Sequence, residues 1–131
     1  VSKFWSLIGC KISLMSAEDH DAILAKTSHL PHLLSSLISE SMYDEPDRSG
    51  ALAHAAGSFR DMSRISASDP AIWADIFLAN DLKLLESLDR FLVRLENMKN
   101  KIASGNHSEV KRFLEKGKTV RDHFSSITKE L

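Results

Sequence analysis

The stretch LANDLKLLESLDRFLVRLENMKNKI, residues 78–102, decides the fold class of this 131-residue chain. Its apolar side chains recur at spacings of three and four, which is the periodicity of one face of an α-helix. The apolar positions are Leu78, Leu82, Leu85, Leu88, Leu92, Leu95, Met98 and Ile102. The spacing predicts one long helix that runs to Gly105, and a seam of this kind is typical of a helical core or a dimer stripe.

The same helical periodicity continues on both sides of this stretch. Residues 110–127 predict a last amphipathic helix, antiparallel to the one before it. Asp69 followed by Pro70 predicts a helix start, since Asp supplies a capping acceptor and Pro has a preset φ. Ser16 with Asp19 is a near capping box, which predicts a long helix up to about Met42.

The predicted helix that starts at Ser16 has two unlike faces. One is an apolar stripe, made of Ile23, Leu24, Thr27, Leu30, Leu34, Leu37 and Ile38. The opposite flank is small and polar, made of Asp21, Ala25, Ser28, His29, His32, Ser36 and Ser39. We expect a kink at Pro31, because proline lacks an N–H and its ring clashes with the carbonyl of Thr27.

The remaining segments are short. Phe4–Ile8 reads as the end of a helix that Gly9 caps. Lys11–Met15 carries the one strand signal, and it either pairs outside this chain or is an extended linker. Residues 43–50 predict a loop and 51–57 a short helix. The chain opens without an initiator Met, so we expect a piece of a longer protein. The predicted fold is all-α, a helical bundle with two long C-terminal helices.

Composition narrows the class of protein. With 43% hydrophobic and 27% charged residues, we expect one globular domain that buries its own core. The net charge of −1 gives no general attraction for nucleic acid or membrane, and no apolar run approaches the roughly 20 residues of a membrane span. We expect a cytoplasmic protein. The single Cys10 excludes an internal disulfide and is interpreted as a small buried hydrophobe.

Two segments carry candidate site residues. His29 and His32 flank the expected kink, so they either line a site or are surface histidines beside a tolerated proline. The second segment holds Asp61, Arg64 and Trp73. A guanidinium beside an aromatic ring suits an anionic ligand, but a surface ion pair between Asp61 and Arg64 would give the same pattern.

Three other features of the sequence bear on phosphate, dinucleotide and metal binding. Gly117-Lys118-Thr119 resembles the end of a phosphate-binding loop but lies in a predicted amphipathic helix, so it is a false positive. No dinucleotide-binding glycine fingerprint is present. His20-Asp21, with His54, would suit a metal phosphohydrolase. This hypothesis requires further His and Asp side chains from elsewhere in the chain to bind the same metal ion. We predict no metal site.

The block FWSLIGCKISLMSAEDHDAILAKTSHLPH, followed by GSFRDMSRISASDPAIWADIFLAN, closely resembles the C-terminal helical domain of prephenate and arogenate dehydrogenases. The resemblance implies a fold like the C-terminal domain of 6-phosphogluconate dehydrogenase. It assigns residues 1–15 to the end of a preceding nucleotide-binding domain, with a leftover strand, and residues 16–131 to a substrate-binding and dimerisation domain.

The resemblance also implies roles for the candidate residues. Arg64 matches an arginine that binds a substrate carboxylate, and His32 a residue that contacts substrate or the inhibitor tyrosine. Trp73 matches a tryptophan beside that pocket. His29 is expected to support the pocket from behind, and Asp61 to lie near the dimer interface, where it can pair with the arginine.

For the complete protein the resemblance implies oxidative decarboxylation of prephenate or arogenate with NAD or NADP, in tyrosine biosynthesis. The catalytic histidine and the cofactor site would lie outside these residues, so we expect the chain alone to be an inactive homodimer. The alternative is a free-standing helical dimer with a regulatory role and no enzymatic activity.

Overall fold

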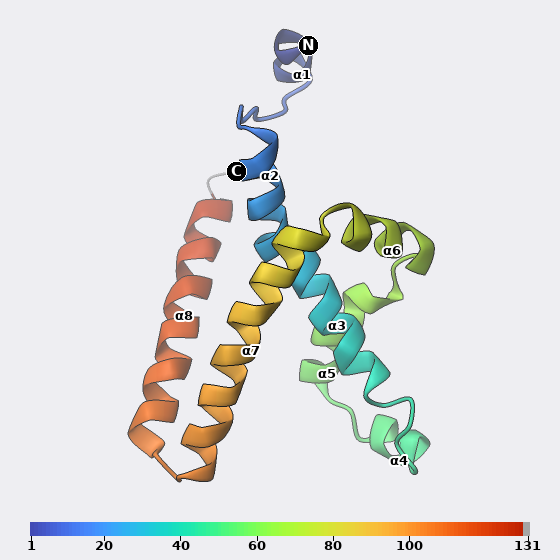
Figure 1. The fold of residues 1–131 in the computed structure, drawn as a ribbon, viewed down its shortest axis with the longest axis vertical. Coiled ribbons are helices and arrows are strands. Elements are labelled where there is room, and N and C mark those ends of the chain that lie inside the picture. The colour runs from blue at the N-terminus through green and yellow to red at the C-terminus, as the bar shows by residue number, and fades with distance from the viewer. Residues whose placement is uncertain (130–131) are drawn as a thin grey trace. The chain divides into compact units, whose positions relative to one another are not determined.

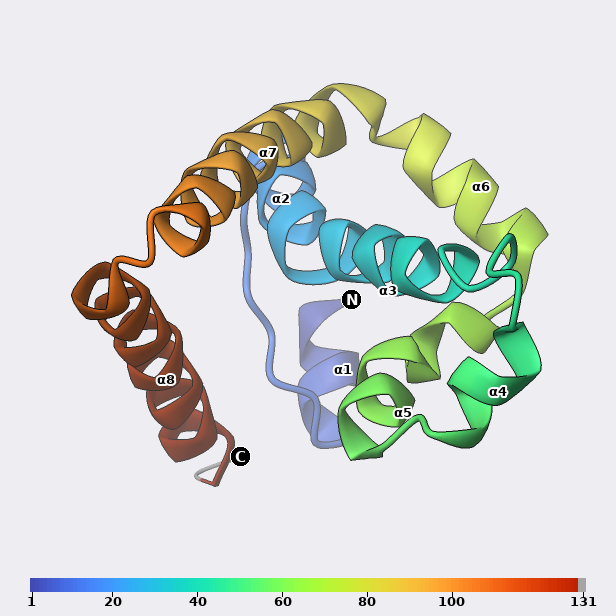
Figure 2. The same ribbon diagram turned by 90° about the horizontal axis from the view of Figure 1, so that it is seen from below.

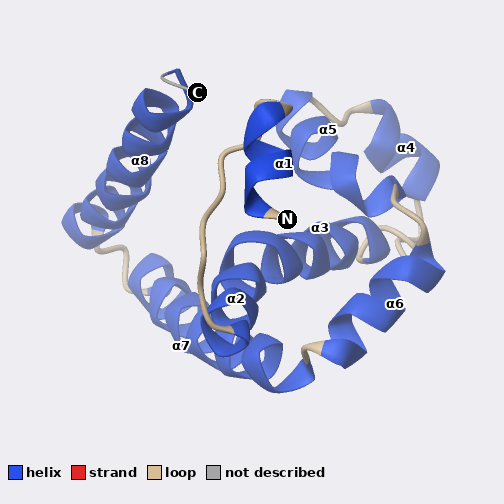
Figure 3. Ribbon diagram, turned by 90° about the horizontal axis from the view of Figure 1, so that it is seen from above, coloured by secondary structure: helices blue, strands red, loops and turns tan. Residues whose placement is uncertain are grey.

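The computed structural model describes residues 1–129, and the chain divides into two compact units, Val1–Leu88 and Asp89–Leu131. All regular secondary structure in the described residues is helical, and Figure 3 accordingly shows helices and loops but no strand. The predicted all-α fold class is therefore confirmed. No helix in this part of the chain is long and apolar enough to cross a membrane.

The first unit contains most of the elements. They are α1 (Ser2–Leu7), α2 (Ala17–Leu24), the π-helical turn η1 (Ala25–His29), α3 (Leu30–Glu40), α4 (Arg48–Ala53), α5 (Gly57–Ser63), the 3₁₀ turn η2 (Arg64–Ala67), α6 (Pro70–Ala79) and the start of α7 (Asp81–Ala103). Helix α7 crosses into the second unit, which also holds α8 (His107–Lys129).

The N-terminal helix ends as its sequence predicts. Gly9 adopts φ +86°, and the N–H of Cys10 bonds the carbonyl of Trp5 at 3.0 Å, which closes a glycine-capped helix end. The strand expected at Lys11–Met15 is not formed, because the segment has no regular structure and a lone strand has no ladder partner. The interpretation of Cys10 as buried was wrong, since its side chain is exposed.

The helix predicted from Ser16 to Met42 is a nearly continuous run of α2, η1 and α3 (Figure 1). The hydroxyl of Ser16 accepts a bond from the N–H of Asp19 at 3.0 Å, so the predicted N-cap is confirmed. The disturbance expected at Pro31 takes the form of the π turn just before it, where the N–H of Leu30 bonds the carbonyl of Ala25. This wider turn accommodates the proline within the run.

Helix α3 packs against α5 and η2. In Figure 2, α4 and α5 lie on one side of α3 and α6 lies on the other, and the opposite view in Figure 3 shows the same arrangement. The short helix expected at 51–57 is displaced toward the N-terminus, because Asp47 caps α4 through the N–H of Gly50 at 3.1 Å. Gly57 instead opens α5.

The leucine seam of residues 78–102 is divided between two helices. Helix α6 ends at Ala79, Asn80 adopts φ −124° and ψ 37°, and α7 begins at Asp81. The prediction of one uninterrupted helix was therefore wrong at this residue. Asn80 leaves the helical region of φ and ψ, as its preference for turns allows, although the apolar spacing continues across it.

The second unit is a helical hairpin. Gly105, at φ +63°, and the bond from the N–H of Asn106 to the carbonyl of Lys101 at 3.1 Å end α7 in a glycine cap. Lys101 also pairs with Glu109 of α8 at 2.7 Å. Helix α8 then returns antiparallel to the last part of α7, as the sequence predicts (Figure 1).

The expectation that the chain buries a sizeable core of its own was wrong. Among the described residues, Ala25 and Leu84 are the only buried hydrophobic side chains, with 0% and 6% of their surface exposed. On the run of α2, η1 and α3 the buried residues are Ala25 and His29 of the small polar flank, together with Ser35, whereas Ile23 and Leu37 of the apolar stripe are 46% and 47% exposed. Small side chains allow neighbouring helices to approach closely, which accounts for the burial of Ala25 and Ser35.

We predict that Asp69→Ala lowers the free energy of unfolding by about 1 kcal/mol, the usual cost of losing an N-cap. The Asp69 carboxylate accepts bonds from the N–H groups of Ala71 and Ile72, at 2.8 and 3.4 Å, and alanine leaves both without that partner. Urea unfolding measures the change. Asp75→Ala removes the same charge from the exposed middle of α6 and is the matched control, so equal losses in the two variants would contradict the capping role.

Candidate functional site

The structure brings three of the five predicted site residues together. His32 of α3 stacks on Trp73 of α6, with ring centroids 3.3 Å apart and an angle of 17° between the planes. His29, at the end of η1, meets the same indole at a centroid distance of 6.3 Å and an angle of 79°. We name these residues, His29, His32 and Trp73, the His–Trp cluster.

The His–Trp cluster borders a small pocket. The pocket has a volume of about 150 Å³ and lies between α3 and the segment that leads from η2 into α6. Its lining residues are His32, Ser36, Ile65, Ser66, Ser68, Pro70 and Trp73. The stacked imidazole and indole form one wall of the pocket. Trp73 covers one face of the His32 ring, so the edge of that ring can contact a ligand.

His29 occupies a different environment from His32. It is 6% exposed, and its Nδ1 lies 3.3 Å from the side-chain nitrogen of Asn80. The same Asn80 nitrogen donates to the backbone carbonyl of Asp21 at 2.9 Å. His29 is therefore held in the interior of the first unit, and its expected role behind a substrate pocket stays a prediction.

Both histidines are disposed to be uncharged. Burial lowers the pKa of His29 from 6.5; the carboxylate of Asp21 opposes this shift and the imidazole of His20 adds to it. Burial also lowers the pKa of His32, and the neighbouring His29 lowers it further. A neutral imidazole has one hydrogen-bond donor and one acceptor. His32, which lines the pocket, can therefore bond to either an acceptor or a donor of a ligand.

Arg64 lies at the first position of η2 and its side chain is exposed. It is not among the residues that line the 150 Å³ pocket, although its neighbours Ile65 and Ser66 are. Within residues 1–129 its guanidinium has no ion-pair or hydrogen-bond partner. Its assignment as an anion anchor stays a prediction, and the structure leaves its five donors available.

Asp61 pairs with a different arginine from the one that sequence reasoning considered. Its carboxylate lies 3.7 Å from Nε of Arg60, and the two side chains are 78% and 82% exposed. No ion pair joins Asp61 to Arg64 in the described residues. An exposed pair at this distance adds little stability, and the expected place of Asp61 near a dimer interface stays a prediction.

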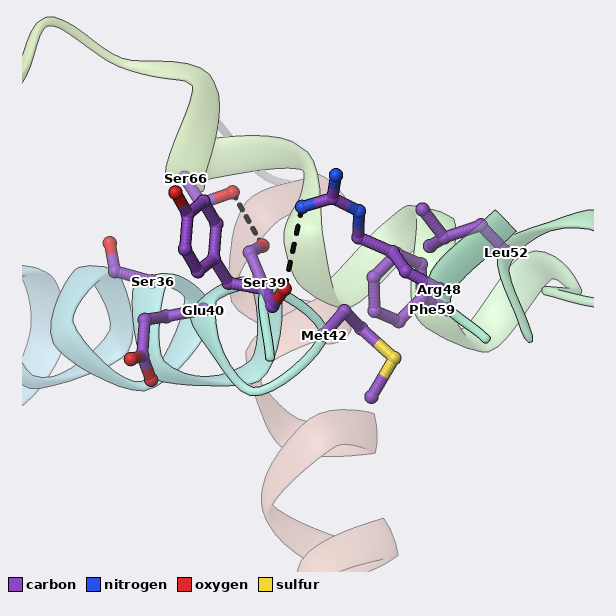
Figure 4. A pocket seen from close by; sticks show the side chains of 9 residues that line it. Ser36, Ser39, Glu40, Met42, Arg48, Leu52, Phe59 and Ser66 are labelled. Carbon is purple, nitrogen blue, oxygen red and sulfur yellow. Dashed lines mark hydrogen bonds between the residues drawn. The ribbon is translucent and has the colours of Figure 1, made fainter. Parts of the chain in front are cut away.

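Sequence reasoning did not identify a second, larger pocket of about 460 Å³. It is lined by Ser36, Ser39, Glu40, Met42, Tyr43, Arg48, Leu52, Phe59 and Ser66. Figure 4 shows Ser39 bonded to Ser66 at 2.7 Å and Arg48 donating to the carbonyl of Tyr43 at 3.4 Å. Because Ser36 and Ser66 line both pockets, the two are neighbours. The serines of the small polar flank were the available signal.

Comparison with known proteins identifies the family. The family described as "Prephenate dehydrogenase, dimerization domain" matches residues 16–116. The chain belongs to this family. Among curated relatives, cyclohexadienyl dehydrogenase of Zymomonas mobilis is 45% identical over 106 residues, which cover 79% of this chain and 36% of the relative. Prephenate dehydrogenase of Lactococcus lactis is 31% identical over 85% of this chain and 32% of its own length.

Solved structures give the same answer for the fold. Arogenate dehydrogenase of Synechocystis matches with a TM-score of 0.86 and 28% identity, over 94% of this chain and 45% of that one. Prephenate dehydrogenase of A. aeolicus, in complex with hydroxyphenyl propionate and NAD+, matches with a TM-score of 0.87 and 27% identity, over 94% and 43%. The chain thus spans about a third of the curated relatives and less than half of these solved ones.

The patterns weighed for a dinucleotide and for a metal ion can be placed in the structure of residues 1–129. A dinucleotide site needs a strand, a glycine-rich turn and a helix N-terminus, and the described residues form no strand. Gly117-Lys118-Thr119 lies inside α8, as predicted. No three His, Cys, Asp or Glu side chains of residues 1–129 gather to hold a metal ion. His20 instead lies beside Asp21, with 3.0 Å between Nδ1 and Oδ1.

We predict that His29 and His32 titrate below 6.5 and that the domain loses stability as pH falls. The unfolded chain takes up protons near 6.5 and the folded chain only at lower pH. Between those values the unfolded state binds more protons, so the unfolding free energy decreases as the pH falls through and below 6.5. Proton NMR titration and urea unfolding at several pH values measure both effects. Midpoints at or above 6.5 would contradict this.

Proposed function

We propose that this chain is the substrate-binding and dimerisation domain of a dehydrogenase that acts on prephenate or arogenate. Membership of the family supports the reaction class, and the relatives are named for prephenate, arogenate and cyclohexadienyl substrates. The observation that carries the proposal is the stack of His32 on Trp73 beside a pocket. Two residues that are 41 positions apart meet there in the geometry of a ligand wall.

Each residue of the chain has a limited task in this proposal. Arg64 binds a carboxylate of the substrate through its planar donor fork, and no internal carboxylate competes for it among the described residues. His32 hydrogen-bonds the substrate from the edge of its ring. Trp73 covers the imidazole and keeps water from one side of the contact. Asp61, paired with Arg60 in the isolated chain, lies near the dimer interface.

The chemistry of the complete enzyme requires residues outside this chain. Oxidative decarboxylation needs NAD or NADP as the oxidant, and we place that site in a preceding nucleotide-binding domain to which residues 1–15 belong. Residues 16–131 then form the helical domain, and the chain alone has no turnover. The substrate pocket also accepts tyrosine as an inhibitor, and the enzyme works in the cytoplasm.

The exposed apolar side chains of the C-terminal helices support a homodimer. On α7 and α8, Leu92, Val93, Leu95, Ile102, Phe113, Leu114, Val120, Phe124 and Ile127 are all between 46% and 71% exposed. They recur at helical spacing and form continuous seams. Burial of such surface is worth about 25 cal/mol per Å², so a second copy of the chain is a favourable cover. The family description names the same role.

We predict that Arg64→Ala weakens binding of prephenate, arogenate or tyrosine to the chain by about tenfold to a hundredfold. This corresponds to about 1.5–3 kcal/mol, the typical worth of a hydrogen bond to a charged group. Isothermal titration calorimetry with the three ligands measures it and shows which of them the pocket prefers. Arg60→Ala, which removes another exposed guanidinium one turn earlier, is the matched control.

The pattern of affinities decides this proposal. If Arg64→Ala loses affinity for the ligand and Arg60→Ala retains it, the result supports Arg64 as the residue that binds the substrate carboxylate. Equal losses in both variants, or none in Arg64→Ala, would contradict it. If the intact chain binds none of the three ligands, substrate binding by this domain on its own is refuted, and the dimer becomes its testable role.

We predict that Val120→Glu converts the chain from dimer to monomer. Val120 is 71% exposed on the apolar seam of α8, and a buried valine contributes about 1.5 kcal/mol or more at each copy. A carboxylate there should weaken association at least tenfold, because its burial is costly. Sedimentation velocity measures the change. Ser126→Glu adds the same charge on the opposite face of α8, so dissociation of both variants alike would contradict a specific seam.

A further inference from the structure

Asn80 connects three elements of the first unit through one side chain. It lies at the break between α6 and α7, and its side-chain nitrogen faces two atoms from the run of α2 and η1. One is the backbone oxygen of Asp21 at 2.9 Å, and the other is Nδ1 of His29 at 3.3 Å. The sequence shows neither contact, since they span 59 and 51 residues.

The hydrogen-bond pattern determines where His29 carries its proton. A backbone carbonyl can only accept, so the atom that faces Asp21 must be the amide nitrogen and not the amide oxygen of Asn80. That nitrogen can only donate. Its second N–H therefore meets a lone pair on His29, which leaves Nδ1 bare and places the ring proton on Nε2.

We propose that Asn80 is a positioning residue of the His–Trp cluster: by donating to both Asp21 and His29 it holds His29 as the neutral Nε2–H tautomer in a fixed ring orientation. The part of this proposal that concerns ligand binding rests on the proposed function, because the His–Trp cluster borders the proposed substrate pocket. The assignment of the tautomer stands on the geometry alone.

The fixed ring of His29 has a direct structural consequence. His29 is 6% exposed and meets Trp73 at 79°, while the same indole stacks on His32 at 17°. Asn80 thus orients His29, His29 limits the rotation of Trp73, and Trp73 sets the plane of His32. The residue that contacts ligand is placed through two intermediate rings.

The surroundings of His29 agree with a neutral ring. His20 and Asp21 face it from α2, and His32 faces it from α3. The imidazole of His20 disfavours a positive charge on His29 and the carboxylate of Asp21 favours it, but burial outweighs the carboxylate and lowers the pKa of His29. A protonated ring would also direct an N–H against the N–H of Asn80, which is a repulsive contact.

The first test is the tautomer of the chain as it stands. Long-range ¹H–¹⁵N correlation spectra separate a protonated ring nitrogen from a bare one. We expect His29 to show a bare Nδ1 and a protonated Nε2 at neutral pH. A bare Nε2, or rapid averaging between the two tautomers, would overturn the proposal without any variant being needed.

The second test changes the donor to an acceptor. Asn80→Asp keeps the shape of the side chain but presents only acceptors, so His29 must protonate Nδ1, and the bare-Nδ1 signal should be lost. The ring-current shift of the His32 protons, which stack on Trp73, should change with it. Asn97→Asp makes the same substitution on an exposed position of α7 and is the matched control.

The remaining outcomes are decisive. A folded Asn80→Asp variant with an unchanged His29 tautomer would overturn the proposal. If that variant does not fold, Asn80→Ala takes its place. We expect the His29 ring of Asn80→Ala to average between its two tautomers, and an unchanged bare Nδ1 would overturn the proposal. None of these spectra needs a ligand, so a failure of prephenate, arogenate and tyrosine to bind refutes substrate binding by this domain on its own and leaves the role of Asn80 intact.

Discussion

The missing N–H of Pro31 is the constraint on which the site depends. An α-helical turn cannot continue unchanged through a proline, and the chain resolves this with the π turn of Ala25–His29 directly before it. A π turn holds one residue more than the hydrogen-bonding register of an α-helix, so it rotates the helix that follows relative to the one that precedes. His29 closes this turn and is buried, whereas His32 lies one turn later at the edge of a pocket. Two histidines with nearly the same sequence context thus acquire different environments.

Local chemistry predicted the helix ends well. The acceptors at Ser16 and Asp69, and the glycines at 9 and 105, act within three or four residues, so their effect is visible in the sequence. The break at Asn80 was missed because the leucine spacing continues on both sides of it, and periodicity cannot register a turn that preserves the apolar face. The second pocket was missed for a related reason: its serines and Phe59 come together only through the packing of α3 on α5 and η2.

The buried face of the first helical run shows a further limit of hydrophobic patterning. Leucines and isoleucines form the obvious stripe, yet Ala25, His29 and Ser35 are the residues most withdrawn from solvent. Patterning assumes that the chain covers its own apolar surface. Here much of that surface is exposed in the single chain, while small residues are covered by close helix contacts. Local patterns made His32 and Trp73 candidates separately, but the 40 residues between them leave no local signal of their stacking.

The two arginines near the site differ in what a binding anion would have to displace. Arg60 already lies beside the carboxylate of Asp61, so an incoming anion must separate that pair or share it. Arg64 has no such neighbour in the described residues, and an anion there exchanges only with water. The cost is then the dehydration of a weakly hydrated guanidinium and part of its side-chain entropy of about 2 kcal/mol. Of these two arginines one helical turn apart, Arg60 is thus paired with a carboxylate within the chain, whereas Arg64 is available to an external anion.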